Sequence, residues 1–144
     1  MRIELPTPHI NQRQILESSK RFIVVMCGRR FGKSELSQIL GITEALKGGS
    51  VAYVTPTYGL AQVFFERLTK TLPFKNNISK LKIYCPNEGS IEFFTGERLD
   101  NLRGRKFHLV IIDEAAFISD LEDGWNNSIR PTLTDYEGRA VFLS

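Results

Sequence analysis

The chain has 144 residues, a formal net charge of +3 at pH 7, 42% hydrophobic residues and 24% charged residues. This length suits one domain with a sizeable core, the ordinary composition argues against a disordered chain, and no apolar run approaches the length of a membrane span. The first eight residues lack the hydrophobic core of a signal peptide and the two cysteines suit a reducing compartment, so we expect an intracellular protein. The mild charge does not by itself indicate nucleic-acid binding.

The first 20 residues contain two prolines and then a polar segment with Gln12, which predicts a short helix leading into the first strand. The planar amide of a glutamine can donate to and accept from the edge of adenine, so Gln12 is a candidate contact for a nucleotide base. From the residues alone, a surface amide is the simpler interpretation. Residues 21–26 (RFIVVM) form a β-branched apolar run that predicts a buried strand.

The next eight residues (CGRRFGKS, 27–34) have the layout of a phosphate-binding P-loop between a strand and a helix. In such a loop backbone N–H groups surround the phosphates, the lysine (Lys33) reaches the β- and γ-phosphates, and the hydroxyl (Ser34) binds Mg²⁺. The other candidate nucleotide contacts are Cys27, Gly28, Arg29, Arg30, Phe31 and Gly32. We interpret Cys27, at the usual first-glycine position, as a tolerated small residue; either arginine is a candidate contact for the γ-phosphate. The alternative is a glycine-rich turn with an incidental lysine.

Helix and strand patterns alternate after the loop. Residues 35–46 predict a helix that stops at Gly48 and Gly49, residues 51–55 a strand, and residues 58–72 a second helix. Residues 82–85 and 90–94 flank a four-residue turn and predict a β-hairpin. The expected core-facing residues of the two helices are Leu36, Ile39, Leu40, Thr43 and Leu46 in the first, and Leu60, Val63, Phe64, Phe65, Leu68 and Leu72 in the second.

A basic segment follows the hairpin. Arg98, Arg103, Arg105 and Lys106 gather in a stretch rich in glycine and polar residues, which predicts a loop. From charge alone a solvated loop is the simpler interpretation. The alternative is that Arg103 reaches the nucleotide site of a neighbouring subunit, where a supplied arginine can raise the rate by roughly 10³–10⁵.

An acidic pair ends the next predicted strand, residues 109–112 (LVII). A carboxylate at this place, Asp113, suits Mg²⁺ directly or through water, and Glu114 one residue further suits the orientation of an attacking water. The weaker alternative is an acidic helix start. The later residues Asp120, Glu122 and Asp123 predict a solvated loop or helix start rather than a metal site.

The order of these elements predicts an α/β fold: a P-loop NTPase three-layer sandwich with a mostly parallel central sheet and an inserted β-hairpin at an edge. Residues 139–144 begin another buried-looking strand and then stop. We therefore expect residues 1–144 to be a P-loop ATPase domain truncated at its C-terminal end.

Nearly end to end, the sequence resembles the ATPase domain of the large subunit of bacteriophage terminases, the motors that package DNA into capsids. The matching blocks occur in family order: 9–12 (HINQ), 28–34 (GRRFGKS), 55–58 (TPTY), 102–104 (LRG), 113–116 (DEAA), 125–131 and 138–144. The resemblance implies that ATP and Mg²⁺ are the cofactors, that Gln12 is the adenine-motif glutamine and that Arg29 is the P-loop arginine. It also implies that Arg103 is a finger for an adjacent subunit, and that one strand separates the P-loop strand from the acidic strand.

The resemblance further implies partners for a parent protein. These are double-stranded DNA, held mainly through phosphates, the portal protein of the procapsid, the small terminase subunit and a homo-oligomeric ring, in the host cytoplasm and without a membrane. In the family a coupling motif and then a metal-dependent nuclease domain follow the last strand. We expect the present chain alone to be a poor ATPase.

Two other functions compete with packaging. A helicase-type nucleic-acid translocase also combines an upstream glutamine, a P-loop and Asp-Glu, but Ala116 stands where many RNA helicases have an acid or histidine. An ATP-binding docking module without turnover is the second alternative, and Glu114 argues against it.

Overall fold

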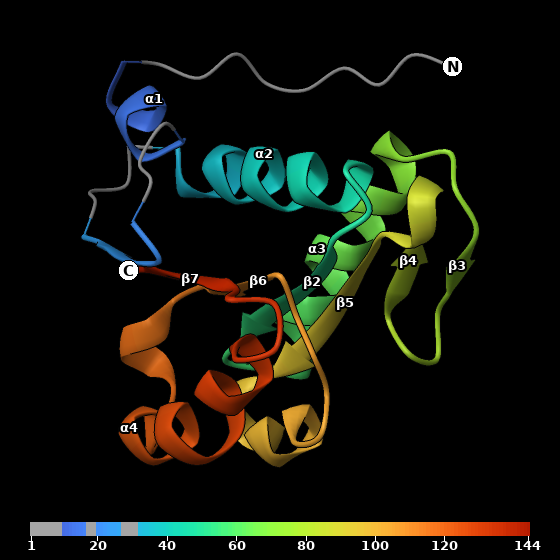
Figure 1. Cartoon of the computed structure of the whole chain (residues 1–144). Coiled ribbons are helices and arrows are strands. Elements are labelled where there is room, and N and C mark those ends of the chain that lie inside the picture. Colours follow the sequence, from blue (N-terminus) through green and yellow to red (C-terminus); the bar gives the residue numbers. More distant parts are fainter. Residues whose placement is uncertain (1–9, 17–19, 27–31) are drawn as a thin grey trace.

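The computed structural model describes residues 10–16, 20–26 and 32–144, which build one seven-stranded sheet (Figure 1). In spatial order its strands are β1 (Phe22–Val25), β7 (Arg139–Leu143), β6 (Leu109–Ile112), β2 (Ser50–Thr55), β5 (Ser90–Thr95), β4 (Lys82–Tyr84) and β3 (Asn76–Asn77). The pairs from β1 to β5 are parallel, and those of β5 with β4 and β4 with β3 are antiparallel. The predicted mostly parallel sheet is confirmed.

The order of the strands also confirms two finer predictions. Strand β7 lies between β1, which precedes the P-loop residues, and β6, which precedes the acidic pair. The hairpin formed by β4 and β5 lies toward the edge that β3 closes. Its second strand, β5, pairs in parallel with β2 along six residues, so the hairpin is part of the main sheet rather than an appendage.

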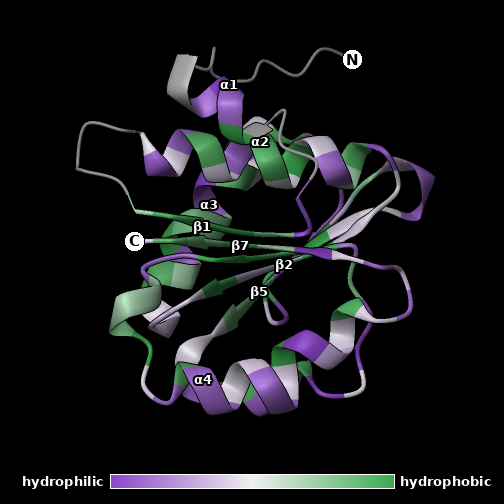
Figure 2. Cartoon of the chain, turned by 60° about the vertical axis from the view of Figure 1, so that its left-hand side comes forward, coloured by the Kyte–Doolittle hydropathy of each residue, from purple (hydrophilic) through white to green (hydrophobic). Residues whose placement is uncertain are grey.

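Helices cover the two faces of the sheet and make a three-layer sandwich. The helices are α1 (Ile10–Leu16), α2 (Lys33–Leu46), α3 (Tyr58–Thr71) and α4 (Leu121–Gly124), with short 3-10 or π segments around α4 and at Gly96–Leu102. One core joins α2 and α3 to alternate strand residues such as Val51, Ile91 and Ile111, and a second core joins the segments around α4 to residues such as Ala52 and Val110. Figure 2 shows the sheet between α2 and α4.

The structure corrects the predicted core faces of both long helices. In α2, Thr43 is exposed and the neighbouring Ile42 is buried instead. In α3, Leu60 and Val63 are 39% and 50% exposed. The buried residues of α3 are Ala61, Phe65 and Leu68, with Leu72 just after the helix and Phe64 partly buried. The buried face of α3 differs from the predicted one because the ring of Phe65 packs edge-on against Phe93 of β5. The predicted stop after α2 is confirmed by Gly48, whose φ is +99°.

Within the described ranges, no helix has both the length and the apolar character needed to cross a bilayer.

Candidate functional site

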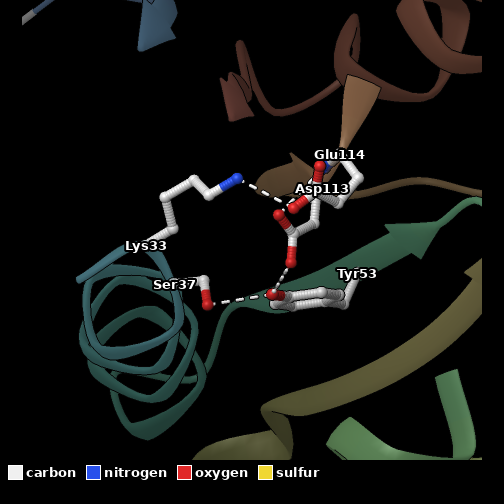
Figure 3. Close-up of polar contacts among 5 residues, drawn as sticks. All are labelled: Lys33, Ser37, Tyr53, Asp113 and Glu114. Carbon is white, nitrogen blue, oxygen red and sulfur yellow. Dashed lines mark hydrogen bonds and ion pairs between the residues drawn. The ribbon is translucent and has the colours of Figure 1, made fainter. Parts of the chain in front are cut away.

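Two residues 81 positions apart form the centre of the candidate site. Lys33 is the first residue of α2 and Glu114 follows β6 by two positions; Lys33 Nζ lies 2.8 Å from Glu114 Oε1 (Figure 3). Glu114 has φ +50°, a left-handed conformation that is uncommon for a residue with a side chain. The structure thus brings together the lysine and the second carboxylate that the sequence pattern singles out.

Asp113, the first carboxylate of the pair, is buried and held at both oxygens. The backbone N–H of Glu114 donates to Oδ1 at 2.9 Å, and the hydroxyl of Tyr53 donates to Oδ2 at 3.0 Å. Burial raises the pKa of Asp113 above its ordinary value, although the two hydrogen bonds and Lys33 favour the ionised form. The carboxylate is therefore desolvated but still oriented for a cation.

Tyr53, on β2, is a residue of the site that the sequence interpretation did not identify. It is 3% exposed, and its hydroxyl oxygen also lies 2.9 Å from Oγ of Ser37 in α2. Burial raises the pKa of Tyr53 well above the ordinary value, and the carboxylate of Asp113 adds to the rise. The hydroxyl therefore stays protonated and acts as a donor at neutral pH.

A small pocket of about 90 Å³ lies where these elements meet. Its lining residues are Lys33, Ser34, Thr55, Pro56, Leu60, Phe64, Asp113 and Glu114. The hydroxyl of Ser34 and the carboxylate of Asp113 are oxygen donors of the kind that Mg²⁺ prefers, and both residues line this one pocket. The donor set therefore fits Mg²⁺. An apolar pocket of about 560 Å³, lined in part by the 75% exposed Phe117, adjoins it at Glu114.

Gln12 in α1 lies against the end of the P-loop segment. Its side chain is fully buried, and Nε2 donates to the backbone oxygen of Gly32 at 3.0 Å. Gly32 has φ +79°, and a Cβ there would lie 2.6 Å from Gln12 Nε2, so both conformation and space favour glycine. The surface-amide interpretation of Gln12 is wrong, whereas its contact with adenine stays a prediction.

The predicted finger, Arg103, lies apart from this pocket. Its Nε donates to Oγ of Ser128 at 3.3 Å, and Arg103 is not among the residues that line the pocket around Lys33. Its neighbours in the basic segment have acidic partners. Arg105 makes a two-pronged ion pair with the buried Glu92 at 2.6 and 3.2 Å, and Lys106 lies 2.8 Å from Asp135. Much of the charge of this segment is therefore locally balanced.

Five of the predicted nucleotide contacts, Cys27, Gly28, Arg29, Arg30 and Phe31, lie outside the described residues. At the acidic segment the structure agrees with the prediction of a helix start, because Asp120 is the N-terminal cap of α4. The part of the chain that the structure describes contains no group of three or more His, Cys, Asp or Glu side chains that could hold a metal ion.

Comparisons with known proteins point in one direction, although no family model matches the chain. The chain is 29% identical over 132 residues to the terminase large subunit of Escherichia phage T5, covering 86% of the chain and 30% of that protein. It is 29% identical over 163 residues to the terminase large subunit of Thermus phage G20c, covering 95% of the chain and 33% of that protein. The chain thus spans about a third of the length of these curated relatives.

Solved structures agree. The large terminase ATPase domain of Thermus phage P74-26 matches with a TM-score of 0.78 and 27% identity, covering 96% of the chain and 64% of that domain. The large terminase of a thermophilic bacteriophage, solved in complex with ADP, shares the fold with a TM-score of 0.71 at 15% identity, over 93% of this chain and 38% of that one. In sequence and in fold, the chain therefore resembles the ATPase domain of bacteriophage terminase large subunits.

Proposed function

We propose that this chain is the Mg²⁺-dependent ATPase part of a viral DNA-packaging motor, which hydrolyses ATP to translocate double-stranded DNA into a procapsid. The observation that carries the proposal is the 2.8 Å contact between Lys33 and Glu114 beside the buried Asp113. The similarity to terminase large subunits supports the packaging role, and the ADP bound to the large terminase of the thermophilic bacteriophage supports a nucleotide as ligand.

In this proposal each side chain of the site has one task. Lys33 binds the β- and γ-phosphates, and Ser34 and Asp113 hold Mg²⁺, which neutralises charge that develops on the phosphates. Glu114 orients the attacking water and accepts its proton. Gln12 contacts adenine, the backbone of Cys27 to Gly32 surrounds the phosphates, and Arg29 adds positive charge at the γ-phosphate.

We place this activity in a longer parent protein. Its proposed partners are double-stranded DNA, the portal protein of the procapsid, the small terminase subunit and further copies in a ring, in the cytoplasm of the host cell. A nuclease domain in that parent protein is part of the same hypothesis.

The direct test is ATP hydrolysis by the parent protein and its Glu114→Gln variant. We expect the variant to bind ATP and to lose turnover by at least about 10²-fold, because the removed carboxylate prepares the water. Unchanged hydrolysis would show that Glu114 is not the water-activating residue. If the wild-type parent binds ATP but does not hydrolyse it even when assembled, the docking module is the better assignment.

Two further assays separate packaging from helicase activity and place Arg103. Stimulation of the ATPase by procapsid and portal favours packaging, whereas strand separation by the parent favours a helicase. Mixing Arg103→Ala subunits with Lys33→Ala subunits should restore part of the hydrolysis if Arg103 acts on a neighbour's nucleotide. No restoration would place its action within one subunit.

A further inference from the structure

We propose that Tyr53 is a positioning residue for the magnesium site: its hydroxyl fixes the carboxylate of Asp113 and links it to the first turns of α2, which contain Ser34. This inference rests on the proposed function and adds to it a residue that belongs to neither the P-loop nor the acidic pair. Figure 3 shows the side chain of Tyr53 reaching from β2 to both Ser37 and Asp113.

Aromatic packing fixes the ring of Tyr53 and therefore the position of its hydroxyl. Its centroid lies 5.4 Å from that of Phe64 in α3 and 5.1 Å from that of Phe93 in β5, and the residue is 3% exposed. Strands β2 and β6 are neighbours in which Tyr53 is opposite Ile111, two residues before Asp113. Because residues 111 and 113 share one face of the strand, the hydroxyl meets Asp113 just beyond the end of β6.

Counting protons gives the network a direction. Oγ of Ser37 lies 2.9 Å from both the Tyr53 hydroxyl and the backbone oxygen of Ser34, and the Tyr53 hydroxyl lies 3.0 Å from Oδ2 of Asp113. An ionised carboxylate has no proton to donate, so Tyr53 must spend its single proton on Asp113. The Ser37 hydroxyl also has one proton and lies within hydrogen-bond distance of the Tyr53 hydroxyl and the backbone oxygen of Ser34, so it can donate to one of them at a time. The ionised Asp113 thus fixes the direction of the Tyr53 hydroxyl in a chain of contacts that runs from Ser37 through Tyr53 to Asp113.

This chain fixes the carboxylate for a cation without using up its acceptor capacity. The N–H of Glu114 holds Oδ1 and Tyr53 holds Oδ2, which prevents rotation of the carboxylate, yet each oxygen keeps a second lone pair. Outer partners of this kind orient metal ligands, and their loss commonly costs 10–100-fold in metal affinity. The substitution Tyr53→Phe would keep the ring packing and remove only the donor.

The test compares Tyr53→Phe with a control, Tyr84→Phe, in which the removed hydroxyl belongs to β4, which strand β5 separates from β2. Binding of a non-hydrolysable ATP analogue to the purified chain is measured by calorimetry in EDTA and across a Mg²⁺ titration. For Tyr53→Phe we expect affinity in EDTA within about twofold of wild type and a Mg²⁺ midpoint raised by about 10-fold or more. For Tyr84→Phe we expect both values unchanged.

A second variant, Ser37→Ala, removes the hydroxyl that contacts Tyr53 and leaves the aromatic packing intact. We expect it to raise the Mg²⁺ midpoint by a smaller factor, about two- to threefold. Thermal unfolding of each variant serves as the control that it is folded. A Tyr53→Phe chain with the wild-type Mg²⁺ midpoint, or with equal losses in EDTA and in Mg²⁺, would overturn the positioning role alone. A wild-type chain whose affinity does not rise with Mg²⁺ would overturn the proposed function and this role together.

Discussion

The substitution Glu114→Gln, which we expect to remove most of the turnover, should also tighten nucleotide binding. The Lys33 ammonium lies 2.8 Å from Glu114 Oε1, and in the proposed function the phosphates require that same ammonium. A bound nucleotide must therefore compete with the carboxylate for Lys33. Because glutamine has the same shape but no charge, the variant lowers the cost of this competition.

The size of the effect follows from the exposure of the pair. The side chains of Lys33 and Glu114 are 21% and 35% exposed, so water screens their attraction and the pair is worth about 0.5–1 kcal/mol. At about 1.4 kcal/mol per tenfold change, this predicts that Glu114→Gln binds a nucleotide about two- to fivefold more tightly.

The assay is calorimetric titration of a non-hydrolysable ATP analogue in EDTA at low salt, where Mg²⁺ does not contribute. The matched control is Glu35→Gln: Glu35 lies exposed in the first turn of α2, so its replacement removes the same charge near the loop without touching the ion pair. We expect a smaller gain for the control, and a gain for Glu114→Gln that shrinks with added salt. Weaker binding by Glu114→Gln, or equal gains for both variants, would refute the competition.

Three further predictions concern stability and reactivity. Burial raises the pKa of Asp113 above the ordinary 3.8, so the stability of the folded chain falls as the pH rises from 3.8 through the raised value. In thermal scans in EDTA, the Asp113→Asn variant should therefore melt at a higher temperature than wild type at pH 7 and lose that advantage toward pH 4. Burial raises the pKa of Cys85 to about 11, so in a Cys27→Ser background the folded chain should react with a thiol reagent at pH 8 far more slowly than the unfolded chain, and equal rates would contradict this. A Cβ at Gly89 would collide with the backbone oxygen of Ala45 in α2, so Gly89→Ala should lose about 2–3 kcal/mol in urea unfolding, whereas Gly59→Ala, with open space around it, should not be destabilised.

The local patterns of the chain were sufficient to predict the architecture. Runs of β-branched residues, glycine stops and a turn between two strands each carry their signal within a few residues. Six of the seven strands and the two long helices are therefore predicted close to their observed bounds, whereas the two-residue strand β3 is not predicted. The meeting of Lys33 and Glu114 was also predictable, because the carboxyl ends of parallel strands share one edge of a sheet.

The faces of the helices were predicted less well, for a physical reason. In α3 the run Val63, Phe64, Phe65 offers three large apolar residues that point about 100° apart, so the sequence does not show which one meets the sheet. The choice is made by the partner: Phe65 packs edge-on against Phe93, and Val63 is left half exposed. Which face of α3 is buried therefore depends on a strand that lies well downstream in the chain.

The burial of Tyr53 can be predicted from its own strand, but the partner of its hydroxyl cannot. Its strand is apolar at 51, 52 and 54, so a tyrosine there is buried, and a buried phenol hydroxyl needs a partner. Because side chains alternate along a strand, residue 53 lies on one face of β2, and the register with β6 puts residues 111 and 113 on the same face. Given that register, the acceptor that a buried hydroxyl requires is Asp113. The missing information was therefore the alignment of two neighbouring strands, a single number that no motif at either position encodes.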